Sequence, residues 1–194
     1  MIPRSAVSLA GAALLLSAAS APLAAQTSRP VEFRVLAGAA MPLGPSGFSD
    51  RWNPGPGGAI SVGYTVLPRT TISAELGYSR YPGELLALPV ISGTVRTSAP
   101  PSSLWTAWLD GSRSFLDGGI QPRIHAGVGI AAFGAARTGL GLHLGAGLDV
   151  PIASRLAMVF DATFAHTFVP SGSGNYALDS SYSYLPLRVG VSWR

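Results

Sequence analysis

The sequence has no cysteine and no lysine, and it has few charged residues of any kind. The absence of cysteine excludes both a disulfide framework and a cysteine-ligated metal site. Charged residues make up 11% of the chain, whereas about 25% is usual in a soluble domain. The basic residues are all arginines, which are scattered singly and give a net charge of +4. We therefore expect no nucleic-acid partner.

A long apolar run is also missing from residues 26–194, so no transmembrane helix is expected there. The start of the chain differs, because Arg4 precedes the short apolar stretch AVSLAGAALLLSAASA and then small residues up to Ala25. This order is typical of a secretory signal peptide. A transmembrane anchor is the alternative, but the run is short and no positive flank follows it. We predict a signal peptide over residues 1–25 and one domain over residues 26–194.

Alternation of apolar and small or polar residues is what the domain has in abundance. In TGLGLHLGAGLDVP (138–151), Leu140, Leu142 and Leu144 share one face, and Gly141 and His143 share the other. This period of two is typical of half-buried strands, and no helical period persists. The pattern predicts eight strands, at residues 31–39, 59–66, 71–79, 104–115, 123–133, 138–151, 156–168 and 184–193.

The connections between these segments alternate in length. Short ones lie near 67–70, 116–119 and 151–155, and long ones rich in Gly, Pro and Ser lie at 40–58, 82–102 and 169–182. Turns at one end and large loops at the other are typical of membrane barrels. The sequence therefore predicts an all-β fold, an eight-stranded antiparallel up-and-down transmembrane β-barrel with both ends of the chain at the turn end.

The content of the less bulky face decides which side of the barrel is outside. That face carries ten ionisable residues, with acids and bases nearly balanced: Glu32, Arg34, Glu75, Asp110, Arg123, His125, His143, Asp149, Asp161 and Arg188. A soluble lipid-binding barrel, the alternative, would need a water-facing surface far richer in charge. A membrane barrel instead turns the bulky face to lipid, pairs every backbone polar group and encloses the ions, which neutralise one another. We predict this second arrangement, with a lumen filled by a polar network.

Aromatic residues near the strand ends support the membrane orientation, because such rings form girdles at the two interfaces. The predicted girdle consists of Tyr64, Tyr78, Trp105, Phe115, Phe133, Phe168, Tyr184 and Trp193.

Two stretches resemble a known family. IQPRIHAGVGIAAFG (120–134) resembles the RPYxGAGxGxA strand of small outer-membrane barrels, the OmpA/OmpX-like porin superfamily, and SYLPLRVGVSWR (183–194) resembles their closing strand. The resemblance implies a Gram-negative outer membrane, contact with its lipid and lipopolysaccharide, and recognition by the barrel-assembly machinery through Trp193. The chain departs from the family at Arg194, where members usually have Phe.

Three patterns suggest chemistry, and none is strong. GVGIAA (127–132) matches a dinucleotide fingerprint, but its residues continue as a strand rather than opening a helix. His125 and His143 share the inward face of adjacent strands, which favours a polar network over a metal site. The third pattern is His166, which could suggest a lipid A deacylase, but the sequence around it lacks the HxS pattern of those enzymes. We therefore expect no catalysis, no cofactor and no metal.

The predicted role is structural or surface-interacting, with any extracellular partner bound by the loops at 40–58, 82–102 and 169–182. A narrow channel for small solutes is the alternative, and a lipid A-modifying enzyme or a soluble lipid binder is less favoured. The apolar stretch LLALPVI (85–91) either extends the neighbouring strands or packs over the barrel mouth, and we expect the second.

Overall fold

The computed structural model describes residues 31–83, 85–90, 93–116, 119–134, 137–169 and 181–194. The predicted signal peptide lies outside these residues. None of the helices described is long and apolar enough to span a bilayer. The main body is a barrel of eight strands: β1 Val31–Gly44, β2 Gly55–Leu67, β3 Thr70–Tyr81, β6 Ser102–Ser114, β7 Gln121–Phe133, β8 Arg137–Ala153, β9 Leu156–Phe168 and β10 Tyr182–Trp193.

The strands follow one another around the barrel in chain order, and each pairs antiparallel with its neighbours. The barrel closes between β1 and β10, where Phe33 lies opposite Trp193 and Val35 opposite Val191. Closure leaves no strand edge, so each strand of the barrel has hydrogen-bonding partners on both sides. The prediction of an eight-stranded up-and-down barrel is confirmed.

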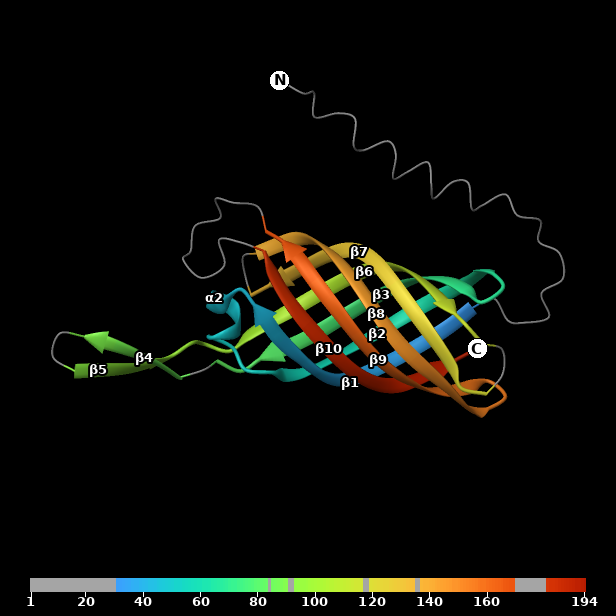
Figure 1. The fold of residues 1–194 in the computed structure, drawn as a ribbon, viewed down its shortest axis with the longest axis horizontal. Coiled ribbons are helices and arrows are strands. Elements are labelled where there is room, and N and C mark those ends of the chain that lie inside the picture. Colours follow the sequence, from blue (N-terminus) through green and yellow to red (C-terminus); the bar gives the residue numbers. More distant parts are fainter. Residues whose placement is uncertain (1–30, 84, 91–92, 117–118, 135–136, 170–180) are drawn as a thin grey trace, which may run out of the picture.

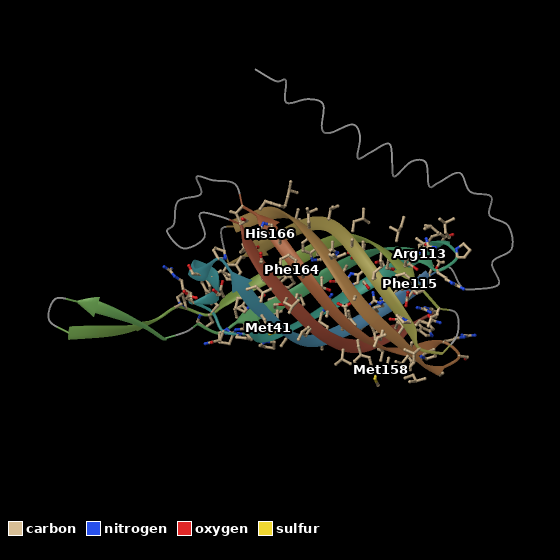
Figure 2. The ribbon with its side chains drawn as sticks, in the orientation of Figure 1. Met41, Arg113, Phe115, Met158, Phe164 and His166 are labelled. Carbon is tan, nitrogen blue, oxygen red and sulfur yellow. The ribbon has the colours of Figure 1, made fainter. Side chains whose placement is uncertain are left out.

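The alternating pattern places the bulky apolar side chains on the outside. Leu140 is 71% exposed and Leu144 is 63% exposed, whereas His143 between them is buried. Figure 2 shows side chains of this kind projecting around the barrel, with Met158 near one end and Phe164 near the other. The predicted orientation of the two faces is therefore correct.

The two ends of the barrel differ as the connection lengths predicted. Tight turns join β2 to β3 and β8 to β9, and Arg69 takes a left-handed φ of 64° in the first of them. The start of β1 and the end of β10 lie at this turn end (Figure 1). The opposite, loop end carries the short helix α2 (Ser46–Ser49) and the hairpin of β4 (Leu85–Val90) and β5 (Gly93–Ser98). Most of the predicted loop at 169–182 lies outside the described residues.

The β4–β5 hairpin projects well beyond the barrel in line with β3 and β6 (Figure 1). Its strands pair from Leu85 opposite Ser98 to Val90 opposite Gly93. The expectation that the apolar stretch at 85–91 packs over the mouth is wrong for residues 85–90, and residue 91 lies outside the described residues. The hairpin is a separate two-stranded sheet, and its register matches the pairing of β3 with β6, which ends at Tyr81 opposite Ser102.

Two members of the predicted girdle, Phe133 and Tyr184, are not on the outer surface. Both are buried inside the loop end of the lumen. They have the parity of the inward face, like His125 on β7 and Arg188 on β10. Position near a strand end does not override this alternation, so the assignment of these two residues to the girdle was wrong. Tyr64, Tyr78, Trp105, Phe115, Phe168 and Trp193 are exposed on the outside.

Candidate functional site

The barrel lumen is the candidate site, because it gathers the ionisable residues of the strands. Each of the ten residues named from the sequence has its side chain inside the barrel and largely buried. The strands bring them together in three groups, which lie near the turn end, at mid-height and around the two histidines.

Asp149 on β8 organises the group at the turn end. Its carboxylate accepts hydrogen bonds from Arg123 Nε at 3.0 Å, Arg34 Nη2 at 3.2 Å and Arg194 Nη2 at 3.0 Å. Glu32 accepts from Arg34 and Arg194, each at 3.1 Å. Sequence reasoning missed Arg194, which follows the last strand and whose side chain turns back across the barrel end. The five groups form an ionic seal at the turn end.

Asp161 on β9 links this group to the middle of the lumen. Arg123 Nη2 donates to Asp161 Oδ2 at 3.0 Å, and Arg188 Nη2 donates to Oδ1 at 2.9 Å. Thr163 Oγ1 donates to the same Oδ1 at 2.8 Å, and Arg188 Nη1 reaches Glu75 Oε1 at 2.7 Å. Removing one member of such a network costs more than the whole network contributes, because the remaining charges stay buried.

The third group consists of Asp110, His125 and His143. His143 Nε2 bonds to Asp110 Oδ1, and Trp108 stacks on the His143 ring with centroids 4.7 Å apart. His125 meets His143 edge to face, with centroids 5.5 Å apart. One ligand atom from each of the three residues lies within 4.8 Å of the others. The sequence suggested the two histidines as neighbours, whereas Asp110 joins them from β6.

An aromatic cap closes the loop end of the lumen. Phe48 on α2 is fully buried, and its ring centroid lies 5.3 Å from Phe133, 5.3 Å from Tyr182 and 5.6 Å from Tyr81. Trp52 packs beside them, 5.0 Å from Phe133. Its Nε1 donates to Pro100 O at 3.1 Å, which ties the β1–β2 connection to the segment before β6. In the sequence, only Phe48 and Trp52, two aromatic residues within the Pro- and Gly-rich stretch at 40–58, could have indicated this cap.

Two small cavities lie between the cap and the ionic seal. One is lined by Glu75, Trp108 and His143 among others, and another by Ser73, Asp110 and His125 among others, each of about 20 Å³. A volume of this size has room for about one water molecule.

One histidine lies outside the lumen. His166 projects from β9 at the loop end (Figure 2), and its Nδ1 lies 2.8 Å from Ser183 Oγ on β10. Its ring also meets Phe168 edge to face. Among the residues that the structure describes, no carboxylate pairs with His166. The pair of His166 and Ser183 therefore lacks the acidic residue that orients the histidine in a catalytic triad. The pair is 17 residues apart in sequence, which is why motif reasoning did not find it.

Comparisons with known proteins agree with this fold. No family model and no curated protein matches the chain. Among solved structures, Neisserial surface protein A has a TM-score of 0.59 at 14% identity, over 84% of this chain and 96% of that one. A major outer membrane protein from Thermus thermophilus has a TM-score of 0.54 at 19% identity, over 86% and 100%. OprG from Pseudomonas aeruginosa has a TM-score of 0.53 at 9% identity, over 85% and 96%.

At these identities the likeness is one of fold. The chain shares the barrel fold of these outer-membrane proteins.

Proposed function

We propose that the chain is an integral barrel of the bacterial outer membrane with a structural or surface-interaction role. The observation that carries this proposal is a continuous outer surface of apolar side chains around a lumen that is filled with ions. Water would penalise the apolar outer surface, whereas hydrocarbon accommodates it. If the faces were reversed, the ions would lie against hydrocarbon, which would penalise them. The fold shared with the known outer-membrane proteins supports the location.

The barrel would not conduct solutes, because both ends of its lumen are filled. The aromatic cap occupies the loop end, and the ionic seal occupies the turn end. Eight-stranded barrels have room inside only for side chains. The small cavities described above support a plugged lumen over the narrow-channel alternative.

The same geometry supports a role for the loop end. If the turn end faces the periplasm, as is usual, the cap and the β4–β5 hairpin stand at the cell surface. The outer wall then contacts outer-membrane lipid and lipopolysaccharide. Trp193, which is exposed beside Phe33 with ring centroids 6.3 Å apart, would serve as the aromatic for the assembly machinery. An extracellular partner would meet the hairpin first.

Membrane fractionation and vesicle permeability test the proposal. We expect the protein in the outer-membrane fraction, with gel migration that changes on heating. We also expect vesicles that contain purified barrels to be as impermeable to small solutes as vesicles without protein. A water-filled porin is the positive control. Protein found in the detergent-free soluble extract would refute the membrane location, and solute flux above the protein-free level would refute the plugged lumen alone.

A further inference from the structure

Asp110 stands apart from the other lumen carboxylates because no arginine neutralises it among the residues that the structure describes. Glu32, Glu75, Asp149 and Asp161 each pair with one or more arginines. Asp110 is buried, and its partner is His143. A buried carboxylate is stabilised by a compensating positive charge, and a bound cation would supply one.

The strand register places a glycine between the two residues. Asp110 lies opposite Gly127 on β7, and Gly127 lies opposite His143 on β8. A Cβ at position 127 would collide with Asp110 Oδ1 and His143 Nε2. The missing side chain therefore creates the space in which these two atoms approach each other.

His125 brings one ring nitrogen within 4.8 Å of the ligand atoms of Asp110 and His143. It lies two residues before Gly127 on the same face of β7, and it is buried. Its Nε2 lies 3.0 Å from Asp161 Oδ2, but without the alignment of a hydrogen bond. Asp161 already accepts from Arg123, Arg188 and Thr163. His125 Nε2 is thus buried without a hydrogen-bond partner among the residues described.

We propose that Asp110, His125 and His143 bind one divalent transition-metal ion inside the lumen, with Zn²⁺ as the best match. Two imidazole nitrogens and one carboxylate oxygen form a common ligand set for zinc, with a fourth position open to water. Ligand atoms around a tetrahedral zinc lie about 3.4 Å apart, and the three atoms here are within 4.8 Å of one another. Side-chain rotations that separate His143 Nε2 from Asp110 Oδ1 would admit the ion, and the adjoining cavity beside Ser73 and Ser112 would accommodate the water.

The surroundings favour a fixed site. Trp108 stacks on His143 and restricts rotation of its ring, and Gly145 leaves room for the His125 ring, which a Cβ would meet. The ligands come from β6, β7 and β8, so the ion would join three consecutive strands. Since both ends of the lumen are filled, the ion would enter while the barrel folds.

The test is metal retention by the full, tag-free chain after folding. The protein is refolded in detergent with Zn²⁺, freed of excess metal, and analysed for zinc per chain. We expect about one zinc per chain in the wild type. Asp110→Asn, His125→Gln and His143→Gln should each lower retention at least about tenfold. Gly127→Ala keeps all three ligands but fills their space, and it should lower retention as well.

His166→Gln is the matched control, because it removes the remaining one of the three histidines from the outer surface. It should retain zinc like the wild type. Heat-modifiable gel migration identifies variants that have folded. A wild type without retained zinc, unchanged retention in folded Asp110→Asn, or loss of zinc in His166→Gln would each overturn the proposal.

A measurement on the wild type alone covers the case in which the ligand variants do not fold. We expect protein refolded with Zn²⁺ to unfold at a higher urea concentration than protein refolded with Mg²⁺, which prefers oxygen ligands. Equal midpoints would refute the metal site. None of these outcomes depends on where the barrel resides or whether it conducts.

Discussion

The two ends of the lumen are closed by opposite kinds of chemistry. At the loop end, five rings brought by α2, the following connection and strands β3, β7 and β10 pack against one another. At the turn end, three arginines share two carboxylates. The first closure depends on apolar contact, which salt does not weaken, whereas the second depends on charges that stabilise only as a balanced set. The two ends should therefore respond differently to the same treatments.

The largest effect is expected from Asp149→Asn at the turn end. The change leaves Arg34, Arg123 and Arg194 without their shared charge, and breaking a buried ionic group in this way costs about 3–5 kcal/mol. Urea unfolding in detergent, followed by tryptophan fluorescence, measures the loss. Asp50→Asn, at the exposed residue after α2, is the control and should cost less than about 0.5 kcal/mol. Similar losses for the two variants would contradict the central place of Asp149.

Phe48→Ala should have the next largest effect, of about 3 kcal/mol. The ring is fully buried among Trp52, Tyr81, Phe133 and Tyr182, and its removal leaves a cavity at the centre of the cap. The same urea experiment should show this loss to be independent of salt between 0.05 and 1 M NaCl, concentrations chosen as roughly the limits of weak and strong screening. A loss that shrinks strongly with salt would mean that the cap depends on charge.

Trp52→Phe should cost about 1 kcal/mol, because it removes the Nε1 hydrogen bond to Pro100 O and keeps an aromatic ring in the cap. Near-ultraviolet circular dichroism of the folded variant should change at the tryptophan bands, while the strand signal in the far ultraviolet stays the same. A variant as stable as the wild type would show that the bond to Pro100 does not hold the cap in place.

Arg194→Gln should have the smallest effect, about 0.5 kcal/mol. Its side chain is 39% exposed, unlike those of Asp149 and Glu32, with which it pairs. Raising NaCl to about 1 M, where the screening length falls to about 3 Å, should reduce the difference from the wild type. A loss as large as that of Asp149→Asn would mean that Arg194 is a full member of the buried network.

The sequence predicted the barrel well because its apolar and polar residues alternate between the outer surface and the lumen. All eight barrel strands, their antiparallel order and the inward placement of residues such as Arg188 follow from a period of two. It also predicted the turn and loop ends, since connection length depends on local Gly, Pro and Ser content. Phe133 and Tyr184 were misplaced where closeness to the strand end was given more weight than parity.

The partners of each ion could not be predicted, because they depend on the stagger of strands far apart in sequence. Arg34 and Asp149 are separated by 115 residues, and nothing local sets their approach. The cap was missed for a related reason, since Phe48 and Trp52 belong to no alternating segment. The hairpin at 85–98 was misjudged because its apolar content was taken as a sign of packing, although strand pairing also accommodates such residues.

The position of that hairpin has a mechanical consequence. Strands β4 and β5 continue β3 and β6, which are neighbours in the closed sheet. A pull on the hairpin tip would run along these two strands and load their lateral hydrogen bonds with β2 and β7 in shear, so that many bonds must break at once. By this geometry the protruding hairpin would bear tension applied at its tip without being peeled from the wall.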